Sequence, residues 1–364
     1  MRAVVLVGGE GTRLRPLTYT TPKPLLPIAN VAHLERQLAW LGAHGVDEVV
    51  LSLGYLPDAF REHFRGDVFA GMRLAYAVED EPLGTAGAIR FAAEGSRGRI
   101  VVCNGDILTD LDLTAMVAFH AERGAEATIS LTEVGDPSAF GVVPTEDDGA
   151  VIAFVEKPAP GKAPSNWINA GTYVLEPAFL DRVPPRLNVS VEREVFPRML
   201  ARPGLLYGFR SDGYWLDIGT PEKYLGAHAD ALAGRLGNPP APGAVETAPG
   251  IWVQGAVEID PAAVLEAPVL LGSGARVAGG ARISGSVVGS GAAIGAGAVI
   301  DRAVLLDGAT VTPGAVVRAS VIGRGGTVEA DAVVDEETIL GAGSVVPSGT
   351  RISGGRIPAA APAG

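Results

Sequence analysis

Short apolar runs alternate with amphipathic stretches along the first two thirds of the chain. The apolar runs predict buried strands at residues 2–7, 46–53, 72–79 and 99–106. Apolar residues at helical spacing predict helices at residues 33–45, 56–64, 84–95 and 112–124. Strands that alternate with helices in this way indicate an α/β, doubly wound domain with a mostly parallel sheet.

The ends of two predicted strands carry residues suited to binding a ligand. Doubly wound sheets bind ligands beyond the carboxyl ends of their strands, at the point where the strand order reverses. If the order begins 3-2-1-4, the first and fourth strands are neighbours at that point. The first strand ends in GGEGTR (8–13) and the fourth in NGD (104–106), so a glycine turn and the carboxylate of Asp106 would share one crevice.

After residue 270 the pattern changes to rows of small residues with three recurring aliphatic columns. The first column contains Leu271, Val288, Leu305, Ile322 and Ile339, the second Val277, Ile294, Val311, Val328 and Val345, and the third Ile283, Ile300, Val317 and Val334, before Arg351 breaks it. Aliphatic residues at this hexapeptide spacing predict a parallel β-helix with three sides per coil. Each column would then stack along the coils as a ladder.

A linker separates the two patterns. The sequence LGNPPAPGAVETAPG at residues 236–250 is rich in proline and glycine, which favour turns. We therefore predict an α/β domain at 1–235, this linker at 236–250, a β-helix at 251–354 and a disordered tail at 355–364. A chain of 364 residues is also longer than one core usually supports.

Composition narrows the choice of partners and compartment. The net charge of −12 argues against a general nucleic-acid or membrane surface, and no apolar run reaches the ~20 residues of a membrane span. The single cysteine, Cys103, excludes an internal disulfide and favours the cytoplasm. Only four of the 29 basic residues are lysines, at positions 23, 157, 162 and 223, so each lysine is a candidate for a specific role.

The glycine turn after the first strand is followed by positive charge and by prolines. It lacks the P-loop pattern, and it fails the dinucleotide fingerprint because Leu14 stands where the third glycine belongs. Taken alone, it is also compatible with a plain strand-to-helix connection. However, its backbone amides can point towards an anion, and Arg13 can donate two hydrogen bonds to a phosphate. Lys23 lies between two prolines, which restrict the rotation of the backbone. Together these features predict a polyphosphate site.

The sequence GGEGTRLRPLT…TPKPLLP resembles the signature of the sugar-phosphate nucleotidyltransferases. Further family motifs follow in order: EPLGTAGAI (81–89), NGD (104–106), FGVV (140–143), FVEKP (154–158), INAGTYVLEP (168–177) and GYWLDIGTPEKYL (213–225). SVEREVFP (190–197) and the β-helix resemble most closely the mannose-1-phosphate guanylyltransferase branch. The resemblance implies a Rossmann-like, GT-A-like domain with a mixed, mostly parallel sheet, followed by a left-handed parallel β-helix.

The same resemblance implies roles for individual residues. Catalytic charge would come from Arg13, Lys23 and Lys157. The nucleotide would be bound by Leu6, Gly8, Gly9, Gly11, Thr12, Arg13, Lys23, Pro82, Gly84, Thr85 and Asp106. The sugar phosphate would be bound by Gly141, Glu156, Lys157, Asn169 and Gly171. Asp106 and Asp217 would share a Mg²⁺ ion, which commonly takes one or two carboxylates together with substrate phosphates.

The implied reaction joins GTP to mannose 1-phosphate and yields GDP-mannose and pyrophosphate. Related enzymes use glucose 1-phosphate with dTTP, UTP or ATP on the same scaffold, so thymidylyl, uridylyl and adenylyl transfer stay open. A non-catalytic regulatory paralogue that binds nucleotide sugars is a further alternative. Such a paralogue should lack charged site residues, whereas Arg13, Lys23, Asp106, Lys157 and Asp217 are all present.

The β-helix raises a separate question, because hexapeptide β-helices resemble acyltransferases that use a catalytic histidine. The five histidines are His33, His44, His63, His120 and His228, and none lies in the repeats. We therefore expect the β-helix to serve as a platform for homo-oligomerisation or regulation.

Overall fold

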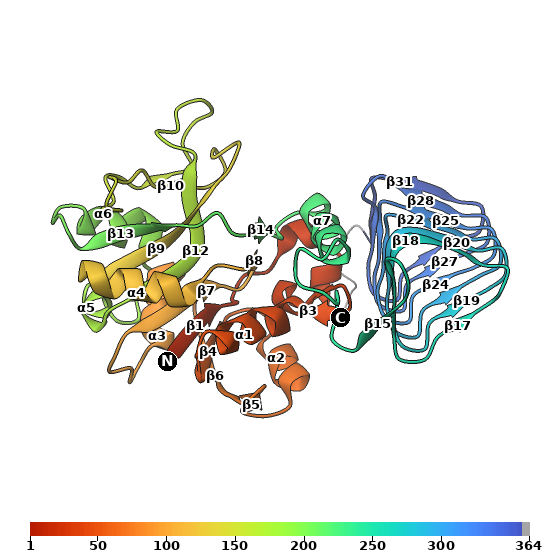
Figure 1. Ribbon diagram of the computed structural model, residues 1–364, viewed down its shortest axis with the longest axis horizontal. Coiled ribbons are helices and arrows are strands. Elements are labelled where there is room, and N and C mark those ends of the chain that lie inside the picture. Colours follow the sequence, from red (N-terminus) through yellow and green to blue (C-terminus); the bar gives the residue numbers. More distant parts are fainter. Residues whose placement is uncertain (359–364) are drawn as a thin grey trace. The chain divides into compact units, whose positions relative to one another are not determined.

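The computed structural model describes residues 1–358, which form two compact units (Figure 1). The first unit consists of Met1–Gly9 and Arg36–Leu216, and the second consists of Glu10–Glu35 with the chain from Asp217 onward. Each unit is therefore assembled from two segments that are distant in sequence.

The first unit contains a mixed sheet of ten strands with a parallel centre. Its order is β11 (Val155–Glu156), β10 (Gly141–Val142), β12 (Trp167–Leu175), β7 (Ile100–Asn104), β1 (Arg2–Leu6), β4 (Glu48–Leu53), β6 (Met72–Val78) and β5 (Val68–Phe69). In addition, β9 (Ala127–Glu133) pairs with β12 and β13 (Leu206–Arg210). Two further strands, β8 (Ile107–Thr109) and β14 (Trp215–Asp217), form a separate small sheet.

The order of the central strands confirms the predicted 3-2-1-4 arrangement. β6, β4, β1 and β7 lie side by side and are parallel, with β1 between β4 and β7. Leu6 at the end of β1 pairs in register with Asn104 at the end of β7. The carboxyl ends of the first and fourth predicted strands therefore meet at the topological switch.

Helices cover the central strands because both faces of these strands are apolar. The helices are α1 (His33–Ala43), α2 (Pro57–Phe64), α3 (Gly84–Ala92), α4 (Leu113–Arg123), α5 (Pro177–Asp181), the π-helical turn η4 (Val191–Val195) and α6 (Phe196–Met199). Ile89 of α3 joins Val4 and Val102 in one buried cluster. The alternate residues Val5 and Cys103 are also fully buried, on the other face of their strands.

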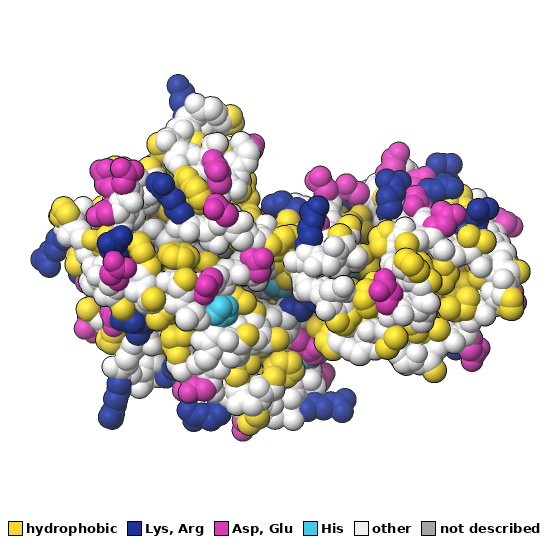
Figure 2. Space-filling model, viewed as in Figure 1, with side chains coloured by type: hydrophobic (Ala, Val, Ile, Leu, Met, Phe, Trp, Pro, Cys, Tyr) yellow, Lys and Arg dark blue, Asp and Glu magenta, His cyan; other side chains and the backbone are white. Residues whose placement is uncertain are grey.

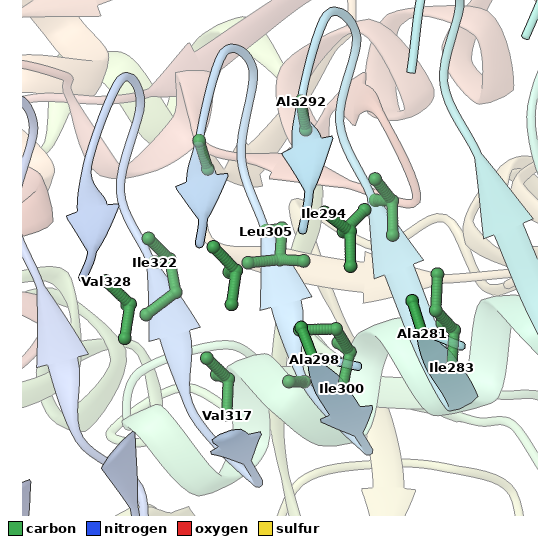
Figure 3. Close-up of a cluster of buried hydrophobic side chains, with 14 of the residues drawn as sticks. Ala281, Ile283, Ala292, Ile294, Ala298, Ile300, Leu305, Val317, Ile322 and Val328 are labelled. Atoms are coloured by element: carbon green, nitrogen blue, oxygen red, sulfur yellow. The ribbon is translucent and has the colours of Figure 1, made fainter. Parts of the chain in front are cut away.

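The second unit contains a parallel β-helix whose strands stack coil upon coil. One sheet contains β15 (Ala244–Ala248), β16 (Ile251–Gln254), β18 (Val264–Leu271), β20 (Arg282–Val288), β22 (Val299–Asp301), β23 (Val304–Leu305), β25 (Val316–Arg318), β26 (Val321–Ile322), β28 (Val333–Asp335), β29 (Ile339–Leu340), β31 (Arg351–Ser353) and β32 (Arg356–Ile357). The other contains β17 (Glu258–Ile259), β19 (Arg276–Val277), β21 (Ala293–Ile294), β24 (Thr310–Val311), β27 (Thr327–Val328) and β30 (Val345–Val346). The aliphatic ladders fill its interior (Figure 3).

The last coil differs from the predicted columns by one residue. Ile322 pairs with Leu340 and not with Ile339, and Val346 and Ile352 continue the other two ladders. The shift follows one extra residue at Glu336 and Glu337, which have φ of 54° and 58°. The prediction that Arg351 interrupts a column was therefore wrong, since Ile352 occupies that place.

Residues 10–35 belong to the unit of the β-helix. They contain three short 3₁₀ turns, η1 (Thr12–Leu14), η2 (Leu17–Tyr19) and η3 (Lys23–Leu25), and the hairpin of β2 (Pro27–Ile28) and β3 (Val31–Ala32). At the hairpin tip, the Asn30 Nδ2 donates to Gln254 Oε1 and to the Val288 carbonyl, each at 3.0 Å. The Tyr224 hydroxyl of α7 (Pro221–Leu232) donates to the Pro27 carbonyl at 2.6 Å. The loop is thus fastened to both α7 and the β-helix.

Strand pairs and hydrogen bonds join segments on either side of the predicted domain boundaries. The predicted domain boundary at residue 235 stays a prediction. Residues 10–35 lie in the same compact unit as the β-helix, and the hydrogen bonds described above join them to it. The predicted linker contains strand β15, which pairs with β16. The predicted disordered tail begins with strand β32, which pairs with β29, and its remainder at 359–364 lies outside the described residues.

Two surface properties bear on possible partners. Among residues 1–358, no helix is both long enough and apolar enough to cross a membrane. On the face shown in Figure 2, Lys and Arg side chains are scattered among Asp and Glu side chains.

Candidate active site

The turn after β1 exposes its glycines to solvent, and close backbone contacts fix the strand end that precedes it. The Gly105 amide donates to the Leu6 carbonyl at 2.9 Å, and a Cβ at Gly105 would lie 2.4 Å from a Val7 methyl group. Gly8 packs against the backbone of Gly54, whereas Gly9 is exposed and has no neighbouring atom where a Cβ would lie. An anionic ligand can therefore approach the backbone at this strand end.

A bulge in β12 brings the NAG motif against the NGD motif. The pairing register of β12 with β9 shifts between Asn169 and Tyr173. Within the shift, Gly171 has φ of 77°, and a Cβ there would lie 2.8 Å from Asn104 Nδ2. The Asn169 side chain accepts from the Gly171 amide at 3.0 Å and donates to the Tyr173 hydroxyl at 2.8 Å. Asn169 therefore shapes the bulge, which is a structural role that its sequence motif did not indicate.

The FGVV and FVEKP motifs face each other across two strands. Gly141 of β10 pairs with Glu156 of β11, and a Cβ at Gly141 would lie 3.0 Å from Glu156 Oε2. Lys157 follows with φ of 48°, and its side chain is 61% exposed, with Nζ 3.9 Å from Glu156 Oε1. The Lys157 ammonium is thus available to a solvent-borne anion beside a half-buried carboxylate.

Glu192 of η4 lies in the SVEREVFP motif, but the sequence analysis assigned it no role. Its Oε2 accepts hydrogen bonds from the hydroxyls of Thr85 and Ser190, both at 2.8 Å. Burial raises the pKa of Glu156 above its usual value, and the charge of Glu192 raises it further, while Lys157 and Arg193 oppose the rise. Glu192 therefore acts electrostatically on the predicted sugar-binding carboxylate.

The turn at residues 82–85 is held from two sides. The Glu79 carboxylate accepts from the Leu83 amide at 2.9 Å, and Asn188 Nδ2 donates to the Pro82 carbonyl at 2.9 Å. Gly84 has φ of 67°, and a Cβ there would lie 2.7 Å from the Val189 carbonyl oxygen. The Thr85 hydroxyl accepts from the Val191 amide at 2.8 Å and donates to Glu192, so it joins this turn to η4. Thr85 is therefore structural as well as a predicted nucleotide ligand.

In the second unit, the other half of the opening signature forms a compact cluster. Gly11 has φ of 61°, and the Thr18 hydroxyl donates to its carbonyl at 3.0 Å. A Cβ at Gly11 would lie 3.0 Å from Lys23 Cβ and from a Thr18 methyl group. Lys23 is consequently buried at the start of η3, with a side chain that is only 8% exposed.

Asp217 lies between two lysines. Its Oδ1 is 3.7 Å from Lys23 Nζ, and its Oδ2 is 3.5 Å from Lys223 Nζ. Oδ1 is buried and accepts no hydrogen bond from the residues that the structure describes. A buried carboxylate oxygen without a hydrogen-bond donor is suited to a hard cation such as Mg²⁺, so Asp217 fits the predicted metal.

The predicted site residues fall into both compact units. Those in the first unit are Leu6, Gly8, Gly9, Pro82, Gly84, Thr85, Asp106, Gly141, Glu156, Lys157, Asn169 and Gly171. Those in the second unit are Gly11, Thr12, Arg13, Lys23 and Asp217. Within residues 1–358 no group of three or more His, Cys, Asp or Glu residues is arranged to hold a metal. A metal shared by Asp106 and Asp217 stays a prediction.

Comparison with known proteins decides the family. A family model described as Nucleotidyl transferase matches residues 2–234. The chain belongs to this nucleotidyltransferase family. A second model, described as EIF2B subunit epsilon LbH domain, matches residues 249–352 and agrees with the left-handed β-helix. The predicted fold class is thereby confirmed for both parts, and the enzyme class follows from the family.

Curated relatives of this nucleotidyltransferase have a common name. Mannose-1-phosphate guanylyltransferase of Mycobacterium tuberculosis is 40% identical over 76% of this chain and 76% of its own. Probable mannose-1-phosphate guanylyltransferase 2 of Arabidopsis thaliana is 44% identical over 62% of this chain and 63% of its own. Members of the family generally use a divalent metal ion.

Solved structures resemble the nucleotidyltransferase over a similar length. HddC from Yersinia pseudotuberculosis is 31% identical, with a TM-score of 0.55, over 62% of this chain and 97% of its own, and it has also been solved complexed with GMP-PN. A putative glucose-1-phosphate thymidylyltransferase from Bacillus anthracis is 26% identical, with a TM-score of 0.57, over 63% of this chain and 94% of its own.

Proposed function

We propose that this nucleotidyltransferase transfers a guanylyl group from GTP to mannose 1-phosphate, giving GDP-mannose and pyrophosphate. The observation that carries the proposal is the shared name of its relatives, which are 38–44% identical and are called mannose-1-phosphate guanylyltransferases. The complex of HddC with GMP-PN supports the choice of a guanine nucleotide.

The reaction is an in-line displacement at the α-phosphorus of the nucleotide. A phosphate oxygen of the sugar phosphate forms the new P–O bond, and the bond to the pyrophosphate oxygen breaks. The nucleophile is already anionic, so no general base is needed, and catalysis consists of positioning and charge stabilisation.

The nucleotide half of the site uses backbone amides and fixed cations. Gly8 and Gly9 present an exposed backbone to the triphosphate, and Gly11 and Thr12 continue that turn. Arg13 and the buried Lys23 stabilise the negative charge that develops on the departing pyrophosphate. A bound Mg²⁺ ion would neutralise phosphate charge, and Asp106 and Asp217 are its proposed ligands.

The sugar half of the site uses one cation and one carboxylate. The exposed ammonium of Lys157 neutralises the sugar phosphate, and Glu156 accepts hydrogen bonds from sugar hydroxyls. Gly141 and Gly171 keep this region free of side chains, which allows the sugar to approach the backbone.

The experiment is a matrix of substrates. Full-length enzyme is incubated with GTP, dTTP, UTP or ATP against mannose 1-phosphate or glucose 1-phosphate, and pyrophosphate and nucleotide sugar are measured. We expect GTP with mannose 1-phosphate to give the highest kcat/KM, with activity lost in EDTA and restored by Mg²⁺. A preference for dTTP with glucose 1-phosphate would overturn the guanylyl assignment.

Location and assembly complete the proposal. The single cysteine, Cys103, is buried, which agrees with a protein that works in the cytoplasm without disulfides. We expect a homo-oligomer that forms through the β-helix. Light scattering of the full chain, and of a full-length variant with a charged residue in place of the exposed Val345 of the β-helix, would test this, since a monomeric full chain contradicts it.

A further inference from the structure

Lys223 occupies a position that is electrostatically unfavourable for a lysine. It lies in the first turn of α7, and its backbone amide donates to the Thr220 hydroxyl at the helix N-cap at 3.3 Å. The N-terminus of a helix carries partial positive charge, so a cation there is destabilised. Lys223 is also one of only four lysines in a chain that otherwise uses arginine for positive charge.

The side chain of Lys223 reaches the cluster that contains the triphosphate-binding residues of the second unit. Its Nζ lies 3.5 Å from Asp217 Oδ2, while Lys23 Nζ lies 3.7 Å from the other oxygen. Two ammonium groups thus share one carboxylate. The Lys223 side chain is 34% exposed, compared with 8% for Lys23, so its head group is the more accessible of the two.

A third cation completes the cluster. A Cβ at Gly219 would lie 2.6 Å from Arg13 Nη2 and 2.9 Å from Asp217 Oδ1, which places the guanidinium at the same turn as the carboxylate. Arg13, Lys23 and Lys223 therefore bring three positive charges to the turn that carries Asp217. Several cations gathered at one turn are suited to binding a polyphosphate.

We infer that Lys223 is a third phosphate-binding cation, which pairs with Asp217 in the free enzyme and binds the pyrophosphate portion of the nucleotide during the reaction. The inference rests on the proposed function, because it assigns a residue to the same site. Its physical basis is the shared carboxylate. Because Asp217 pairs with both Lys23 and Lys223, it neutralises neither ammonium group fully, so Lys223 can also bind a phosphate oxygen. The compact ammonium on its flexible stem suits this change of partner.

The test compares Lys223→Met with Lys223→Arg in the full-length enzyme. Isothermal titration with inorganic pyrophosphate, with and without Mg²⁺, should show binding weakened roughly tenfold in K223M, the loss expected for one charge-assisted hydrogen bond. The KM for the nucleotide should rise by a similar factor, while the KM for the sugar phosphate stays unchanged. K223R should recover part of the pyrophosphate affinity.

Lys162→Met is the matched control, because it removes the same charge from an exposed loop residue of the first unit. It should leave pyrophosphate affinity unchanged. If both Lys223 variants bind pyrophosphate as the wild type does, the inference is wrong, whatever happens to thermal stability. If the wild type itself binds no pyrophosphate and forms no nucleotide sugar, the proposed function is wrong instead, so the two failures are distinguishable.

Discussion

At the scale of single residues, the site depends on glycines that allow polar side chains to approach. Gly171 is the clearest case, because its left-handed backbone and the neighbouring amide of Asn104 both exclude a side chain. The sequence motifs predicted these glycines and the ligands of the proposed site, and those ligand roles stay predictions. Glu192 and Lys223 also lie within the quoted motifs, but the sequence assigned them no specific role, because their roles depend on which groups their side chains reach after folding.

Gly171→Ala should reduce both stability and activity. The added methyl group would lie 2.8 Å from Asn104 Nδ2 at a φ of 77°, so we expect a loss of roughly 1–3 kcal/mol in unfolding free energy and a marked fall in kcat/KM. Gly161→Ala is the control, because Gly161 has φ of 70° with no atom within 4 Å of the Cβ position. Denaturant unfolding and kinetics of both variants check this, and equal effects would contradict the role of the close contact.

Glu192→Gln should shift the pH dependence of sugar-phosphate binding. The charge of Glu192 raises the pKa of Glu156, so a neutral side chain lets that pKa fall towards its usual value. Glu156 then stays ionised to lower pH, and the acid-side rise in KM for the sugar phosphate should move to lower pH. Glutamine can still accept from Thr85 and Ser190, which preserves the local structure.

Glu194→Gln is the matched control for that pH profile. Glu194 lies in the same turn but bonds the Ser190 amide and Arg198, whereas the charge that raises the pKa of Glu156 is that of Glu192. A profile that shifts equally in both variants would mean that the turn itself, and not the charge of Glu192, controls Glu156.

At the scale of elements, apolar periodicity predicted the four parallel strands β1, β4, β6 and β7, the helices α1 to α4 and the β-helix repeat, but not the antiparallel strands β9 to β12. Those predictions held because burial on both faces of a parallel strand, or on the inner side of a coil, leaves a regular apolar pattern. The register of the last coil was missed. One additional residue near Glu336 and Glu337 shifts every later position, and a left-handed backbone at residues other than glycine leaves no clear mark in the sequence.

Glu337→Gly should stabilise the β-helix. Glu337 has φ of 58°, a conformation that costs an ordinary residue on the order of 1 kcal/mol and glycine almost nothing. We therefore expect a small rise in unfolding free energy, of up to about 1 kcal/mol. Ala330→Gly, in the same coil without a positive φ, should lower it. Denaturation followed by circular dichroism distinguishes these outcomes, and a lower stability for E337G would contradict the strain.

At the scale of the whole molecule, the loop at residues 10–35, which we propose binds the triphosphate, forms one compact unit with the β-helix. The loop at residues 10–35 carries Arg13 and Lys23, and its hairpin tip bonds directly to β16 and β20. The sequence motifs assigned this loop to the catalytic domain and could not indicate its support, because hydrogen bonds between distant segments leave no local pattern. The β-helix therefore supports the loop that carries Arg13 and Lys23, both residues of the proposed nucleotide site.

Asn30→Gly should weaken nucleotide binding selectively. It removes two hydrogen bonds of 3.0 Å, to Gln254 and Val288, while glycine accepts the left-handed backbone of Asn30. With about 1 kcal/mol for each bond, we expect the KM for the nucleotide to rise roughly threefold to thirtyfold and that for the sugar phosphate to change little. Ala29→Gly is the control, because Ala29 has a similar backbone and its amide bond to His228 is retained. Equal changes for both substrates would contradict the selective role.

The union of residues 10–35 with the C-terminal part of the chain also sets an order of events during protein synthesis. The loop leaves the ribosome early, but its partners in β16 and β20 are synthesised much later, on the order of tens of seconds at usual rates of translation. Until then, residues 10–35 of the nascent chain lack their hydrogen-bond partners in β16 and β20. The chain should therefore become able to bind the nucleotide late in synthesis, after the first coils of the β-helix have left the ribosome. Incomplete chains should not bind the nucleotide.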